Sequence, residues 1–308
     1  MTAVRLVGAA VQLVGGLLLA PLLPGLVQHL KARLQGRRGP SPLQPYRELR
    51  RLWGKSTVDV EGTSAVYRLA PAVAAAAVLA AVLVVPPTAA VAGWGVGHDV
   101  LAVAGLLALA RFAVAAAAWD TANGFALMGA SRDLMIAVFV EATLVLALAV
   151  AALSAGSTDL TSIIAATAGI RPWAGPLLPL GAAAFGLVVL AETGRQPVDN
   201  PDTHLELTMI HEGPLLEYAG RDLAYLQWAA AARHWVVLVL AAGVFLPHPA
   251  QPWAQLALLP VLLAALCAGL AVAETLVAKM RILRVPRFLA AGALMAGLGI
   301  TARLAGLA

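Results

Sequence analysis

The sequence is poor in charged residues. Only 12% of its 308 residues are charged, whereas 61% are hydrophobic. A soluble domain carries charge on about a quarter of its residues. The mean hydropathy of +0.85 agrees with that contrast. The composition therefore argues against a soluble enzyme and is typical of an integral membrane protein.

Cysteine is almost absent. Cys267 is the only one, and it lies in an apolar run. One cysteine excludes an intramolecular disulfide, a Cys-ligated iron–sulfur cluster and a Cys-based zinc site. Any electron carrier that works with this chain must therefore belong to another subunit, and we expect no cofactor in the chain itself. The basic residues lie in short loops between apolar runs, which does not favour nucleic acid as a partner.

Long apolar runs dominate the chain, and each is close to the ~20 residues that a helix needs to cross a bilayer. Short alternating segments, as in a β-barrel, are not seen. The first run is too long for a signal-peptide core, so we expect it to be a retained helix. The sequence predicts an all-α, polytopic membrane protein with one integral membrane domain over 1–308. It predicts about eight transmembrane helices, near 6–30, 67–87, 99–118, 134–154, 173–191, 229–247, 254–273 and 288–306.

The basic residues indicate how these spans are oriented. Seventeen of the 21 Lys and Arg residues fall in connections 1–2, 3–4, 5–6 and 7–8, and three fall on the other side. Arg111 lies within a span. Because positive charge marks cytoplasmic loops, both termini are predicted to be non-cytoplasmic. The two long connections, 31–66 and 192–228, are then cytoplasmic, and we expect them to form a docking surface.

The first long connection predicts a short basic amphipathic helix after Pro45. Apolar residues recur at helical spacing in "YRELRRLWGK", and Arg47, Arg50 and Arg51 lie elsewhere around the turn. One interpretation is a helix that lies among lipid headgroups and fixes the topology. The other is a docking site for a cytoplasmic partner.

The second long connection is acidic. Residues 191–222 hold seven of the protein's 16 acidic residues. Asn200-Pro201 reads as an N-cap and first helical position, so we expect a helix from there to about Glu212. His204 and His211 would lie two turns apart, about 10 Å along the axis, which is too far for one metal ion. No metal site is predicted, and the carboxylates could simply be solvated.

A few charges lie in or at the ends of the spans. Glu141 sits inside the fourth span among Ile, Val, Phe, Leu and Ala, where we expect it to be buried, and Glu192 and Glu274 close the fifth and seventh. A charge at bilayer depth costs a few kcal/mol, so it is normally paired, hydrated or functional. Glu141 could pair with Arg111 and hold helices together. Alternatively, the carboxylates could form a row that relays protons.

Three stretches together resemble a known family. "AETGRQPVDNPDTHLEL" resembles the signature A-E-T/S-x-R-x-P-x-D-x-P of the complex I membrane subunit that docks the peripheral arm, the subunit 1 family. "GPSPLQPYRELRRLWGK" is similar to that family's first cytoplasmic loop. "GFALMGASRDLMIAVFVE" resembles its fourth-span pattern, with Arg132 nine residues before Glu141. The resemblance covers essentially the whole chain.

The continuation of the signature indicates a branch of this family. The string His-Leu-Glu-Leu-Thr-Met-Ile-His-Glu resembles the membrane-anchor subunit of formate hydrogenlyase and hydrogenase-4, which are membrane-bound group 4 [NiFe] hydrogenases. The quinone-reducing branch continues differently, in the segment that shapes its quinone chamber. The branch therefore implies an anchoring and energy-coupling subunit of such a hydrogenase in a prokaryotic cell membrane.

The resemblance also implies partners and site residues. The partners would be the hydrogenase large and small subunits, an iron–sulfur protein and an antiporter-like membrane subunit, with the [NiFe] centre and iron–sulfur clusters in those subunits. Arg47, Arg50 and Arg51 would serve docking. Arg195 would hold carboxylates by charge-assisted hydrogen bonds, with further support from Arg132, Asp202, His204 and His211. The proton pathway would comprise Glu141, Glu192, Asp199, Glu206, Glu212 and Glu217.

Two other functions remain open at this stage. One is a quinone-binding membrane subunit of a complex I-like NADH dehydrogenase. The other is a free-standing transporter, although neither repeated halves nor helices broken near the midplane are evident. The sequence does not decide whether protons or sodium ions move, and it does not name the electron donor.

Overall fold

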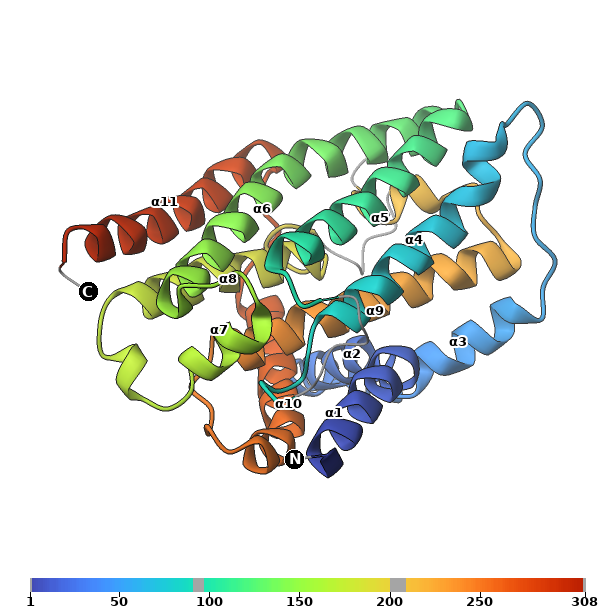
Figure 1. The fold of residues 1–308 in the computed structure, drawn as a ribbon. Coiled ribbons are helices and arrows are strands. Elements are labelled where there is room, and N and C mark those ends of the chain that lie inside the picture. Colours follow the sequence, from blue (N-terminus) through green and yellow to red (C-terminus); the bar gives the residue numbers. More distant parts are fainter. Residues whose placement is uncertain (1, 91–96, 200–208, 307–308) are drawn as a thin grey trace.

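The computed structural model describes residues 2–90, 97–199 and 209–306, and these residues form a bundle of helices without a β-strand (Figure 1). The predicted all-α fold is confirmed. The helices are α1 (Thr2–Val14), η1 (Gly15–Leu19), α2 (Leu22–Leu34), α3 (Gln44–Trp53), α4 (Ala65–Val84), α5 (Val100–Asp120), α6 (Gly124–Ala155), α7 (Leu160–Ala166), η2 (Arg171–Trp173), α8 (Leu177–Glu192), η3 (Gly213–Leu215), α9 (Gly220–Val244), α10 (Pro252–Leu276), η4 (Ile282–Arg284) and α11 (Val285–Leu304).

Six helices of the described chain are long and apolar enough to cross a membrane, and a bent pair raises this number to seven. The pair is the predicted span 6–30. It is not one straight helix, because its two parts meet at 59°. Pro21 stands at the bend and lacks the N–H that would continue the hydrogen-bond ladder. The predicted span 173–191 is observed as α8, which has only 16 residues. The count of eight spans and the sidedness of the termini stay predictions.

Polar side chains fix where several helices begin. Ser64 caps α4 by accepting a hydrogen bond from the Val66 amide, and Asp120 at the end of α5 binds the Ser64 amide at 2.8 Å. Asn123 caps α6 by accepting from the amides of Phe125 and Ala126. These bonds satisfy helix N–H groups that have no partner within the helix. They also hold the ends of α4, α5 and α6 at one end of the bundle.

The four basic connections gather at that same end. The Asn123 side chain donates to the Glu217 carboxylate, and Tyr67 stacks on Tyr218 with ring centroids 4.5 Å apart. The Met280 amide donates to the Pro197 carbonyl at 2.9 Å. At the opposite end, the Val100 amide donates to the Thr158 carbonyl at 3.1 Å. These contacts therefore lie at two opposite ends of the bundle.

The predicted helix between Pro201 and Glu212 is wrong in its last part. Residues 209–212 are not helical and lead directly into η3. Residues 200–208, which would form its first part, lie outside the described residues. A proline at 214 favours this short turn, because its ring fixes the backbone and removes a donor. This irregular segment places His211 against Asp133 of α6.

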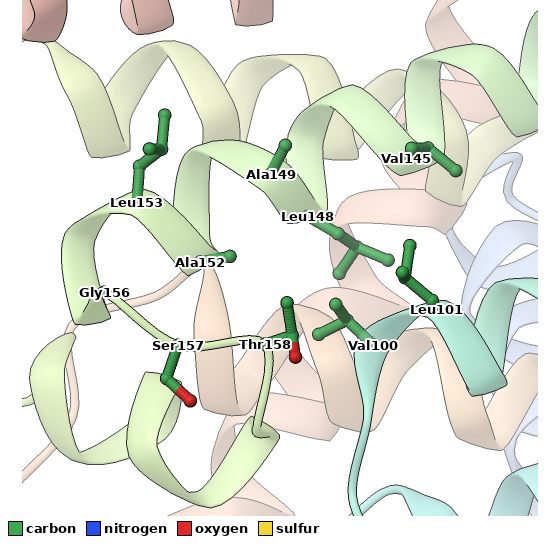
Figure 2. A pocket seen from close by; sticks show the side chains of 10 residues that line it. All are labelled: Val100, Leu101, Val145, Leu148, Ala149, Ala152, Leu153, Gly156, Ser157 and Thr158. Atoms are coloured by element: carbon green, nitrogen blue, oxygen red, sulfur yellow. The ribbon is translucent and has the colours of Figure 1, made fainter.

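An apolar pocket of about 500 Å³ opens at the far end of the bundle, where α5 begins and α6 ends (Figure 2). Leu101, Leu148 and Leu153 are among its lining residues, and Ser157 and Thr158 form its polar rim. It lies away from the end where the acidic connection enters.

Candidate functional site

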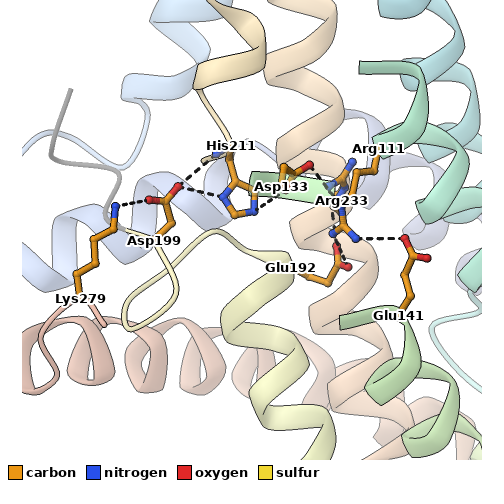
Figure 3. Close-up of polar contacts among 8 residues, drawn as sticks. All are labelled: Arg111, Asp133, Glu141, Glu192, Asp199, His211, Arg233 and Lys279. Carbon is orange, nitrogen blue, oxygen red and sulfur yellow. Dashed lines mark hydrogen bonds and ion pairs between the residues drawn. The ribbon is translucent and has the colours of Figure 1, made fainter. Parts of the chain in front are cut away.

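Arg111 on α5 is the centre of a buried group of charges (Figure 3). Only 4% of its side chain is exposed. Its Nη2 lies 2.7 Å from Glu192 Oε1, and its Nη1 lies 3.3 Å from Glu141 Oε1. Its Nε lies 3.7 Å from Asp133 Oδ2. One guanidinium therefore faces three carboxylates, and this satisfies a charge that would be costly if it were buried alone.

Four helices supply this group. Glu192 ends α8, Asp133 and Glu141 lie about two turns apart on α6, and Arg233 on α9 lies 3.9 Å from Glu192 Oε2. The side chain of Glu192 is 1% exposed. Because residues of four helices must meet here, the ion pairs also fix how the helices pack.

A second line of contacts joins this group to the acidic connection. Lys279 Nζ donates to Asp199 Oδ1 at 2.9 Å. Asp199 Oδ2 lies 3.1 Å from His211 Nδ1 and accepts a hydrogen bond from the His211 amide at 3.3 Å. His211 Nε2 lies 3.7 Å from Asp133 Oδ1. We name the whole set the charged row. Its members, in order, are Lys279, Asp199, His211, Asp133, Arg111 with Glu141, Glu192 and Arg233.

The pairing of Asp199 with His211 shifts both groups. Burial by itself raises the pKa of Asp199, but the hydrogen bonds and charges of His211 and Lys279 outweigh it and hold that pKa below its usual range. Burial by itself lowers the pKa of His211. The hydrogen bond to Asp199 and the charges of Asp133 and Asp199 outweigh it, so the pKa of His211 is raised. Asp199 is thus held as an anion, and protonated His211 is favoured.

Close backbone contacts place the loop against α6. A Cβ added to Gly129 would lie 2.8 Å from the Gly213 Cα, so only glycine fits. Gly129 is one turn before Asp133 on α6, and His211 is two residues before Gly213. The contact therefore brings the imidazole to the Asp133 carboxylate. Gly194, at φ +62°, also packs against the imidazole, since its Cβ would lie 3.3 Å from His211 Nδ1.

A second buried cluster lies near the first. Arg195 Nη1 donates to Glu274 Oε1 at 3.2 Å, and Lys31 Nζ lies 3.3 Å from Glu274 Oε2. The Glu274 side chain is fully buried. This cluster ties α2 to α10 and to the segment after α8. Arg195 thus holds a carboxylate, but not one of the predicted pathway.

The structure brings together only part of the predicted site. Glu141, Glu192, Asp199 and His211 share the charged row, whereas Arg132 lies beside Asp133 on α6. Glu217 lies apart, where its side chain binds Asn123, and Glu212 is exposed. Arg47, Arg50 and Arg51 are exposed on α3, which forms as predicted. Three predicted residues fall outside the described part of the chain: Asp202, His204 and Glu206.

Packing within this chain does not bury Glu141 fully, because 38% of its side chain is exposed. It lines a pocket of about 280 Å³ between α5 and α6. Arg111 forms the inner wall, and Phe112 and Val138 lie near the mouth with largely exposed side chains. The apolar residues around Glu141 in sequence point in all directions from the helix. Its own direction, toward a gap between two helices, is not encoded in their hydropathy.

Sequence reasoning missed several members of the row. Asp133 was not considered as a site residue, and Arg233 and Lys279 were counted only among the basic residues of the connections. A signal for Asp133 existed, because Arg132-Asp133 interrupts an otherwise apolar stretch one turn after Gly129. No such local signal distinguishes Arg233 or Lys279. Within the described ranges, no group of three His, Cys, Asp or Glu side chains could hold a metal ion.

The fold and the charged row define a multi-pass helical membrane protein with a network of ion pairs between its spans. Comparison with known proteins identifies its family. A family model described as NADH dehydrogenase matches residues 7–302, and the chain belongs to that family.

Curated relatives lie in two groups. The chain is 35% identical to hydrogenase-4 component C of Escherichia coli (strain K12), over 75% of this chain and 72% of that protein. It is also 35% identical to formate hydrogenlyase subunit 4 of the same strain, over 77% of this chain and 75% of that protein. The chain is 34% identical to an NADH-quinone oxidoreductase subunit of Cereibacter sphaeroides (strain ATCC 17029 / ATH 2.4.9), over 72% of this chain and 73% of that protein.

A solved structure shares the fold. A chain of the membrane-bound sulfane sulfur reductase, an archaeal respiratory membrane complex, superposes with a TM-score of 0.81. The alignment covers 96% of this chain and 98% of that one, at 22% identity. The relatives thus belong to multi-subunit membrane complexes.

Proposed function

We propose that the chain is the membrane-anchoring and energy-coupling subunit of a membrane-bound [NiFe] hydrogenase of the formate hydrogenlyase type. It resides in a prokaryotic cell membrane. The observation that carries the coupling role is the charged row, which runs without a break from Lys279 and Asp199 at the loop end to Glu141 between the spans. A row of paired charges among apolar helices costs free energy to bury, which favours a functional role.

The anchoring role is supported by the adjacency of the two long connections, 31–66 and 192–228. A Cβ added to Gly220 would lie 2.1 Å from the Ser56 carbonyl oxygen, so the connections are in backbone contact. Trp53 of α3 packs edge-on against Tyr225, with ring centroids 5.0 Å apart. The exposed Arg47, Arg50 and Arg51 lie on the same helix as Trp53. These exposed arginines and the adjoining connections would dock the hydrogenase large and small subunits and an iron–sulfur protein.

Partner subunits would supply the redox chemistry. The [NiFe] centre and the iron–sulfur clusters would reside there, since the only thiol of this chain is buried among apolar residues. The pocket at Glu141 would face an antiporter-like membrane subunit. A partly exposed carboxylate between spans needs a polar or protein neighbour, because lipid offers none.

The test is isolation of the complex and measurement of its coupling. A tagged chain should co-purify with [NiFe] hydrogenase subunits in mild detergent. The reconstituted complex should build an ion gradient while it evolves hydrogen from a soluble electron donor. Purification without any of these hydrogenase proteins would refute the assignment. Co-purification without a gradient would leave the anchoring role and remove the coupling role.

A second candidate is a quinone-binding subunit, which the similarity to the NADH-quinone oxidoreductase protein of Cereibacter sphaeroides favours. The apolar pocket of about 500 Å³ does not support it, because this pocket opens at the end of the bundle away from the acidic connection. Quinone analogues that inhibit electron transfer in the isolated complex would favour the second candidate over the first.

A further inference from the structure

His211 occupies an unusual place in the charged row, because each of its ring nitrogens faces a different carboxylate. Nδ1 lies 3.1 Å from Asp199 Oδ2, and Nε2 lies 3.7 Å from Asp133 Oδ1. Asp199 belongs to the segment after α8, and Asp133 belongs to α6. The ring therefore joins the acidic connection to the spans (Figure 3).

A neutral imidazole fits this arrangement less well than an imidazolium. It carries one N–H and one lone pair, so one of its nitrogens would face a carboxylate oxygen with a lone pair. An imidazolium donates from both nitrogens and faces both carboxylates favourably. The geometry thus favours protonated His211 while Asp199 and Asp133 are ionised.

The charge balance of the row gives the same result. Its fixed cations are Lys279, Arg111 and Arg233, and its carboxylates are Asp199, Asp133, Glu192 and Glu141. Among these seven described residues, three positive charges face four negative charges, so one negative charge is in excess. An imidazolium at 211 supplies the missing charge.

We propose that His211 is a protonation-dependent positioning residue, which decides whether Arg111 pairs with Glu192 or with Asp133. As imidazolium, His211 neutralises the Asp133 carboxylate. Arg111 then pairs most closely with Glu192, because its Nη2 lies 2.7 Å from Glu192 Oε1, whereas its Nε lies 3.7 Å from Asp133 Oδ2. When His211 loses its proton, Asp133 loses a cationic neighbour and draws Arg111. Glu192 and Glu141 are then less stabilised as anions, and one of them binds a proton.

The step balances. An N–H bond of the imidazolium breaks, an O–H bond forms on Glu192 or Glu141, and water carries the proton between them. The total charge of the row is the same before and after the step, because the proton stays within it. Buried charge rearranges without being created, which avoids the large desolvation cost of an unpaired ion.

The groups around His211 agree with this role. Asp199 and Asp133 face the ring directly, Arg111 on α5 stands behind Asp133, and Lys279 stands behind Asp199. The raised pKa of His211 shows that the two carboxylates outweigh burial and the charge of Arg111. The inference rests on the proposed coupling function only for its consequence, since the exchange of partners itself is a property of the chain.

The first test is a titration. The full chain is labelled with ¹⁵N-histidine, and its ring signals are followed by NMR over pH, with the His211→Gln spectrum identifying the signal. We expect a midpoint above the ~6.5 of a free histidine, and a fall of about one pKa unit in Asp133→Asn. A midpoint that is below 6.5, or that Asp133→Asn does not move, overturns the proposal. His29→Gln, on α2 and away from the row, should leave the His211 signal unchanged.

The second test is coupling in sealed vesicles, measured as gradient formed per hydrogen evolved. His211→Gln keeps a hydrogen-bonding side chain but cannot carry the proton, and His211→Lys fixes the charge. Both should assemble and evolve hydrogen with a soluble donor, but lose the gradient. A merely structural role predicts that either variant keeps the wild-type ratio, and that result contradicts the proposal. If the wild-type complex builds no gradient, the coupling function fails, while the titration still decides the role of His211.

Discussion

Replacing Glu141 by Gln distinguishes two roles of this carboxylate, which are structural pairing with Arg111 and proton relay. The substitution keeps size and hydrogen bonding but cannot exchange a proton. Arg111 loses one of three carboxylate partners, and the partner lost is the one whose side chain is 38% exposed. The two carboxylates that remain are both more buried, since the side chains of Asp133 and Glu192 are 13% and 1% exposed. Glu192 and Asp133 still neutralise Arg111, so we expect the complex to assemble at nearly the wild-type level.

The matched substitution Glu192→Gln should behave differently. Glu192 is 1% exposed, and it faces both Arg111 and Arg233. Breaking a buried pair on one side costs about 3–5 kcal/mol, because the remaining charge is left uncompensated. About 3 kcal/mol corresponds to roughly a hundredfold change in an equilibrium constant. We therefore expect little assembled complex from Glu192→Gln, whereas Glu141→Gln should assemble but fail to couple.

The assay is gradient formation in sealed vesicles, normalised to hydrogen evolved and to the amount of complex. Glu61→Gln, on an exposed part of the connection 31–66, makes the same chemical change outside the row and should leave the ratio unchanged. A wild-type ratio in Glu141→Gln would remove Glu141 from the ion pathway. Strongly reduced assembly in Glu141→Gln would show that its pairing with Arg111 is mainly structural.

Other predictions follow from the fold and the row. Cysteines placed at the exposed positions 212, 216 or 283 should react with an impermeant reagent only from the cytoplasmic side, and labelling from outside would reverse the topology. Exchanging Arg47, Arg50 and Arg51 for Glu should release the hydrogenase subunits at moderate salt, whereas retention would assign α3 to the lipid surface. Gly129→Val should displace η3 and lower the His211 midpoint in the NMR titration, because it separates the imidazole from Asp133. Because the pKa of His211 is raised in the folded chain, its pairing contributes fully to folding stability below pH ~6.5, and this contribution is lost as the pH rises through the raised pKa. The pKa of Asp199 is lowered, so its pairing contributes above pH ~3.9 and the contribution is lost on acidification. The melting temperature should therefore fall from neutral to alkaline pH, and His211→Gln should flatten that fall.

Hydropathy and turn chemistry in the sequence were sufficient for the positions of several long helices. The predicted runs 99–118 and 254–273 correspond to α5 and α10 within a few residues. The basic helix after Pro45 was also predictable, because proline, helical spacing and flanking glycine are local signals. The bend after η1 was not predicted, although Pro21 stands at it, since a proline early in an apolar run need not interrupt a span.

Only the tertiary structure decided which charges meet. Arg111 and Glu192 are 81 residues apart in the chain, and nothing local in either segment names the other as its partner. The same holds for Lys31 with Glu274 and for Lys279 with Asp199. Hydropathy is a property of a segment and can be read from a window of sequence. The pairing of two charges depends instead on helix rotation, on close contacts such as Gly129 with Gly213, and on the cost of leaving a buried charge alone, all of which arise only when the helices pack.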